Sequence, residues 1–124
     1  MGEVVLTVSF SKYLSDMIDY CTDTCGLYKN TNEFVTESVR SLMFDVINEE
    51  VNIDDLRQRL KMIIKMDEGA CYEYDISLTN ELYQYMKTVT EYCSCDVNTF
   101  ISMAVNRHST YADDFISNYD AAFQ

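Results

Sequence analysis

Apolar and polar side chains alternate strictly near the start of the chain. The alternating positions are Leu6, Val8 and Phe10 in one set, and Val5, Thr7 and Ser9 in the other. Side chains two residues apart lie on the same face of a strand. This period of two, in a stretch rich in β-branched residues, therefore predicts a β-strand over residues 4–10 with one apolar face.

The spacing then changes to the three and four residues typical of a helix. Ser11 is expected to cap the start of this first helix and Gly26 to end it. Its apolar face consists of Leu14, Met17, Ile18 and Cys21. After a polar turn, Asn32 is expected to cap a second helix. The apolar stripe of that helix consists of Phe34, Val35, Val39, Leu42, Met43 and Val46.

Residues 72–109 repeat the order strand, helix, helix. In its strand, Tyr74, Ile76 and Leu78 point to one face, and Glu73, Asp75 and Ser77 point to the other. Thr79 and Asn98 stand where the first copy has its expected caps. The apolar positions of the two helices are Leu82, Met86 and Val89, then Phe100, Ile101, Ala104 and Val105. An internal repeat of this kind indicates one architecture used twice.

The two copies define four segments, which are 1–47 (first unit), 48–71 (connector), 72–109 (second unit) and 110–124 (tail). Asn52 or Asp54 is expected to cap a connector helix that closes near Gly69. The apolar positions of this helix are Leu56, Leu60, Ile63 and Ile64. In the tail, a further short helix is expected with Tyr111, Phe115 and Ile116 on its apolar side.

Composition supports a helical protein. The 124 residues include no proline and three glycines, which favours helices joined by short turns. The fold class is therefore expected to be mainly α, with one short strand in each copy. No apolar run has the roughly 20 residues of a membrane span, and the start of the chain lacks a basic secretory signal. We expect a cytoplasmic protein without a membrane partner.

The formal net charge is −12, from 21 acidic and nine basic residues. Proteins that bind nucleic acid usually show a basic surface, because phosphate contacts release counterions. The chain as a whole shows the opposite balance, which favours solubility. It shows no Ser/His/Asp arrangement, no phosphate loop and no carboxylate pair with polar partners. Neither enzymatic activity nor a cofactor is expected.

The five cysteines are Cys21, Cys25, Cys71, Cys93 and Cys95. Cys21 and Cys25 are one helical turn apart, whereas Cys93 and Cys95 are too close together for a usual zinc knuckle. Buried or free thiols are the favoured interpretation, and a metal site or a disulfide is the alternative. His108 is the single histidine, so a nickel-sensing set of histidines is not expected.

The first copy contains the motifs Leu6-x-Val8-x-Phe10-Ser11-x-x-Leu14-x-x-x-Ile18-Asp19 and Gly26-x-Tyr28-x-Asn30-x-Asn32-Glu33-Phe34-Val35. Together with the plan of strand, helix and helix, these motifs resemble the ribbon-helix-helix DNA-binding proteins, the superfamily of the Met, Arc and CopG repressors. The first copy resembles archaeal members most closely. The second copy matches in apolar pattern and caps. Together the copies cover about two-thirds of the chain.

The resemblance implies a DNA-binding transcription regulator, a repressor, whose two strands pair antiparallel and enter the major groove. Because one chain contains both strands, residues 4–10 are expected to pair with residues 73–78 in a tandem pseudo-dimer. Pairing between two chains is the alternative, and a higher homo-oligomer would combine several ribbons.

The resemblance also assigns roles to residues. The base-contacting candidates are Val5, Thr7 and Ser9, and the second-ribbon face consists of Glu73, Asp75 and Ser77. The phosphate-contact candidates are Lys12, Lys29, Asn32, Glu33, Asn98 and Thr99. Carboxylates repel phosphates. The alternative function is therefore a protein-interaction or DNA-mimicking module that binds a basic protein.

Overall fold

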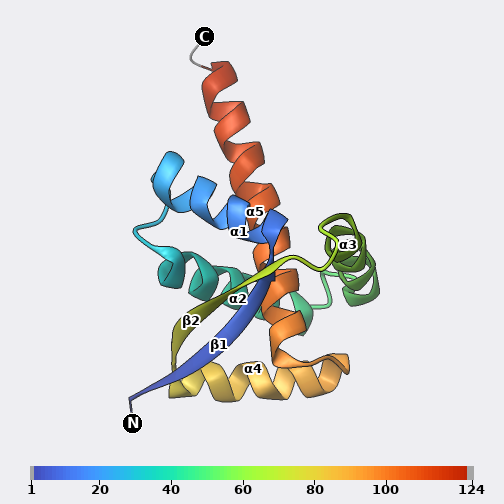
Figure 1. The fold of residues 1–124 in the computed structure, drawn as a ribbon. Coiled ribbons are helices and arrows are strands. Elements are labelled where there is room, and N and C mark those ends of the chain that lie inside the picture. The colour runs from blue at the N-terminus through green and yellow to red at the C-terminus, as the bar shows by residue number, and fades with distance from the viewer. Residues whose placement is uncertain (1, 123–124) are drawn as a thin grey trace.

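The protein is mainly helical and contains one two-stranded sheet. The computed structural model describes the backbone of residues 2–122 and the side chains of residues 2–111. Its elements are β1 (Glu3–Ser11), α1 (Lys12–Asp19), the π-helical turn η1 (Tyr20–Thr24), α2 (Thr31–Ile47), α3 (Ile53–Met66), β2 (Cys71–Thr79), α4 (Asn80–Cys93) and α5 (Val97–Ala122). The order strand, helix, helix occurs once before α3 and once after it (Figure 1).

The two strands form an antiparallel ribbon within the one chain. Their register places Glu3 opposite Thr79 and Ser11 opposite Cys71. Both predicted strands are therefore confirmed, and each extends beyond its predicted ends. The apolar side chains on the inner face include Val8, Phe10, Ile76 and Leu78, which are all buried. A two-stranded ribbon is marginal alone, and here the helices cover that apolar face.

Helices α2 and α5 pack against each other behind the ribbon (Figure 1). Phe34 on α2 and Phe100 on α5 are fully buried in the same core as Phe10 of β1. Arg107 of α5 forms an ion pair with Asp45 of α2. Both halves of the chain thus contribute to one continuous core.

Several predicted helix starts are confirmed. The Ser11 hydroxyl accepts from the Leu14 amide at 3.4 Å, and the Thr79 hydroxyl accepts from the Leu82 amide at 3.2 Å. In the connector, Asn52 is the cap of α3. Each of these side chains satisfies an amide that the first helical turn leaves without a backbone partner.

Two other predicted caps are wrong. The cap of α2 is Asn30, whose side chain accepts from the Glu33 amide at 2.9 Å. Asp96 makes the same bond at the start of α5, accepting from the Thr99 amide at 2.7 Å. The predicted caps Asn32 and Asn98 lie inside the first turns of these helices instead.

The tail does not begin a new helix. Helix α5 continues without a break to Ala122, because no glycine or proline interrupts it. Figure 1 shows its last turns extending beyond the rest of the protein. The predicted apolar positions Phe115 and Ile116 lie outside the described side chains.

Candidate nucleic-acid interface

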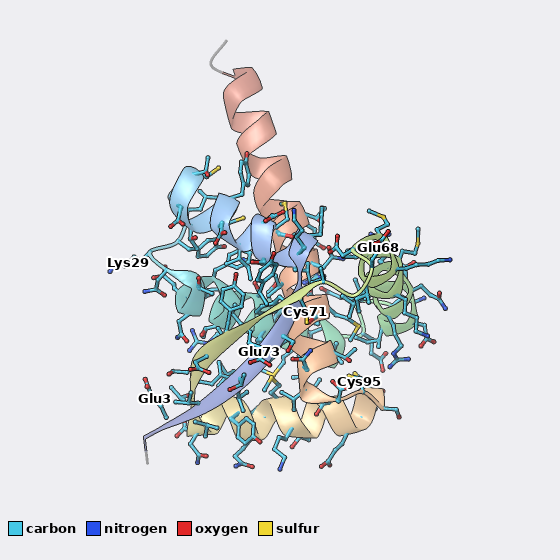
Figure 2. All side chains as sticks on the ribbon, viewed as in Figure 1. Glu3, Lys29, Glu68, Cys71, Glu73 and Cys95 are labelled. Carbon is cyan, nitrogen blue, oxygen red and sulfur yellow. The ribbon has the colours of Figure 1, made fainter. Side chains whose placement is uncertain are left out.

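The outer face of the ribbon presents the side chains predicted to contact bases. Both strands contribute to this face, which consists of Val5, Thr7, Ser9, Glu73, Asp75 and Ser77. The Val5 side chain is 62% exposed, and the two serines are half-buried. Figure 2 shows Glu3 and Glu73 along the ribbon. At the middle of the ribbon the Thr7 hydroxyl donates to the Asp75 carboxylate at 3.0 Å.

Asn98 at the start of α5 holds the outer edge of β1. Its Oδ1 accepts from the Ser9 amide at 2.8 Å, and its Nδ2 donates to the Ser9 carbonyl at 3.1 Å. A side-chain amide thereby takes the place that a third strand would occupy. It satisfies edge groups that would otherwise be open to another chain.

Asn32 at the start of α2 makes the matching pair of bonds with β2. Its Oδ1 accepts from the Ser77 amide at 2.6 Å, and its Nδ2 donates to the Ser77 carbonyl at 3.0 Å. The second helix of each half therefore holds the strand of the other half. This role, rather than capping, explains why an asparagine stands at both positions.

The ribbon register agrees with the sequence repeat. Thr7 and Asp75 correspond to each other in the two copies, and they also lie directly opposite each other in the sheet. Ser9 and Ser77 correspond likewise, and each is held by the corresponding asparagine. Two pairs of hydrogen bonds therefore connect the ribbon to the starts of α2 and α5.

The electrostatics of this face are acidic. Neither strand contains a lysine or an arginine, whereas Glu3, Glu73 and Asp75 are all exposed on the ribbon. A carboxylate can accept a hydrogen bond from cytosine N4 but repels neighbouring phosphates. The ribbon itself supplies hydrogen-bonding groups without any positive charge.

The predicted cations of the first copy are not brought together. Lys12 lies where β1 ends and is paired with Asp16, with 3.1 Å between Nζ and Oδ2. The hydrogen bond to Asp16 raises the pKa of Lys12. Lys29 is exposed in the loop before α2 (Figure 2). Glu33 is exposed in the first turn of α2, and Thr99 is half-buried in that of α5.

No disulfide joins the five cysteines, which all lie within the described side chains: Cys21 is buried, Cys25, Cys93 and Cys95 are partly buried, and Cys71 is exposed. Burial raises the pKa values of Cys93 and Cys95. Among the side chains up to Tyr111, no three His, Cys, Asp or Glu residues gather as a metal site would require.

The described helices include none that is both long and apolar enough to cross a bilayer. Comparisons of the chain with protein-family models, with curated proteins and with solved structures found no match.

Proposed function

We propose that this protein is a DNA-binding transcription regulator whose two ribbon-helix-helix units form a pseudo-dimer within one chain. The ribbon of β1 and β2 enters the major groove, which is wide enough to admit two strands. The resemblance of the first copy to ribbon-helix-helix proteins supports this architecture, with the repressors among them as the functional analogues.

The observation that supports the proposal most strongly is the crosswise pair of asparagine contacts. Asn32 and Asn98 hold the backbones of Ser77 and Ser9 in matching ways, about a centre at the Thr7–Asp75 pair. Such an arrangement is expected of two equivalent units that share one ribbon. It stiffens the ribbon while leaving its outer face uncovered among the described residues.

In the proposed complex, Thr7 and Ser9 form hydrogen bonds with base edges and Val5 contacts a thymine methyl. The first turns of α2 and α5 approach the phosphates on either side of the groove, because helix starts favour anions. The backbone amides near Asn32 and Asn98 are the groups nearest those phosphates.

The direct test is fluorescence anisotropy with duplex fragments at low salt. We expect binding that weakens as salt is added, because phosphate contacts release counterions. Selection from a pool of random duplexes would then identify the preferred sequence. An absence of binding even at the lowest salt would overturn the proposal.

A second candidate function is a protein-interaction module that imitates the charge of DNA. Two observations favour it, namely the exposed carboxylates of Glu73 and Asp75 on the ribbon and the net charge of −12. A basic protein would then cover the ribbon in place of DNA. Pull-down of a basic partner that duplex DNA displaces would support this function.

Charge reversal on the ribbon distinguishes the two functions. For a DNA-binding ribbon, Glu73→Arg with Asp75→Arg should strengthen duplex binding by about tenfold or more, because repulsion becomes attraction. For a protein site, the same variant should lose its basic partner. Glu49→Arg with Glu50→Arg, at exposed positions in the turn after α2, is the control with an equal change in net charge.

A further inference from the structure

Helix α3 concentrates positive charge in an otherwise acidic chain. Residues 57–66 contain four of the nine basic residues and no acidic residue. Arg57 and Arg59 are paired with aspartates of the preceding turn. Lys61 and Lys65 are both exposed, and the ion pairs among side chains 2–111 involve neither of them. One helical turn apart, these two lysines share a face of α3.

Arg57 and Lys61 lie near the end of the ribbon where α5 begins, and Lys65 follows Lys61 by one helical turn. A hollow of about 520 Å³ is lined by Arg57 and Lys61 of α3 together with Thr99 of α5. An adjoining hollow also includes Thr99, and it is bordered by Ser9 of β1 and by Asn98. Figure 1 shows α3 beside the start of β2. The connector thus places cations next to the helix start that holds β1.

The two ends of the ribbon therefore differ in charge. The first turn of α2 includes Glu33, whereas the first turn of α5 contains no acidic residue. The larger hollow is also lined by Asp96, whose carboxylate accepts from the Thr99 amide, and by Glu91, so it contains charges of both signs. Only the α5 end has the cations of α3 beside it.

We infer that Lys61 and Lys65 of α3 contact backbone phosphates of the duplex held by the ribbon, on the side where α5 begins. This inference rests on the proposed function and adds a contact surface from the connector. It compensates for the acidic ribbon, because each phosphate contact releases counterions and adds affinity without base preference.

A membrane surface is the other anionic partner to consider. Met62 and Met66 are 65% and 70% exposed on α3, and cationic helices with apolar residues often bind lipid headgroups. However, the apolar face formed by Leu56 and Leu60 is buried in the core. This face cannot enter a bilayer while the protein is folded, which favours DNA.

The test measures how duplex affinity depends on salt for Lys61→Gln with Lys65→Gln. We expect the slope of log affinity against log salt to become shallower by about 0.9 for each lost contact, so by about 2 in total. Lys87→Gln removes an exposed cation from α4 and should leave the slope unchanged. Far-UV circular dichroism checks that each variant is folded.

The outcomes distinguish failure of the α3 contact alone from failure of the proposed function. Wild-type binding with equal slopes in the wild type and the double variant would overturn the α3 contact alone. No binding by the wild type would overturn both. Lysine-dependent binding to phosphatidylserine vesicles, without duplex binding, would likewise overturn both and assign α3 to a membrane surface.

Discussion

The two halves of the molecule share the order strand, helix, helix. They differ in the charge of their strands and in the charged residues beside the start of their second helices. The outer face of β1 is mostly uncharged, with Thr7 and Ser9, whereas β2 presents Glu73 and Asp75. Conversely, α5 begins beside the cations of α3, and α2 does not. The helix starts and the buried phenylalanines Phe34 and Phe100 correspond in the two halves, whereas the charged residues that face solvent differ between them.

The largest expected effect tests whether both halves share one core. Phe34→Ala and Phe100→Ala each remove a fully buried ring from a corresponding position, and each should cost about 3–5 kcal/mol of unfolding free energy. Urea unfolding followed by circular dichroism should show a single transition in both variants. Phe44→Ala, at a side chain that is 65% exposed on α2, should cost less than about 0.5 kcal/mol. Separate transitions for the two halves would contradict a common core.

A smaller effect tests the crosswise asparagine contacts. Asn32→Ala and Asn98→Ala should each cost about 1–2 kcal/mol, because two backbone groups of the ribbon edge lose their partners. Amide hydrogen exchange gives the sharper measurement. Asn32→Ala should speed exchange at Ser77, and Asn98→Ala should speed it at Ser9. Asn80→Ala, at an exposed position on α4, is the control, and equal exchange in all variants would refute the contact.

The smallest expected effect is on the pH dependence of stability, and it concerns His108, which has no histidine counterpart in the first half. His108 stands where the repeat places Leu42 in the first half. Its Nε2 lies 2.6 Å from the Tyr28 hydroxyl, and its buried Nδ1 has no hydrogen-bond partner within the described side chains. Burial lowers the pKa of His108, opposed by Glu37. The folded protein therefore binds this proton less readily than the unfolded chain does.

Because the pKa is lowered on folding, the contribution of His108 to stability is complete above the unfolded-state pKa of about 6.5. It declines as pH falls below that value toward the folded-state pKa. Urea midpoints measured from about pH 7.5 downward should show this decline in the wild type. His108→Leu, which introduces the first-half residue, should flatten the dependence above the range where carboxylates titrate. An unchanged dependence would contradict a buried neutral imidazole.

Local sequence patterns predicted the elements whose causes are local. The alternation predicts both strands, and the caps Ser11 and Thr79 are predicted because each precedes an apolar helical period. For the connector helix the sequence leaves Asn52 and Asp54 as alternatives, and the structure shows Asn52. Gly26 adopts the left-handed conformation after the first helical segment, as a residue that ends a helix often does. These features depend on a few neighbouring residues.

The wrong predictions have tertiary causes. Asn30 and Asn32 are chemically identical and two residues apart, so local preference does not decide which one caps α2. The Asn32 side chain binds the backbone of Ser77 at the edge of β2, so Asn30 caps the helix instead. The sequence shows that the connector contains a cluster of four basic residues. It does not predict that α3 packs beside α5. Only packing shows which surface such a cluster faces.

The pairing of β1 with β2 inside one polypeptide has a consequence for how the protein responds to dilution and to mutation. When two separate subunits share a ribbon, the folded state weakens as protein concentration falls. Here the connector makes strand pairing unimolecular, so a cell with only a few copies would still contain complete ribbons. A substitution in one strand is also not copied into the other. The chain can therefore evolve a ribbon with two different edges, which a pair of identical subunits cannot do.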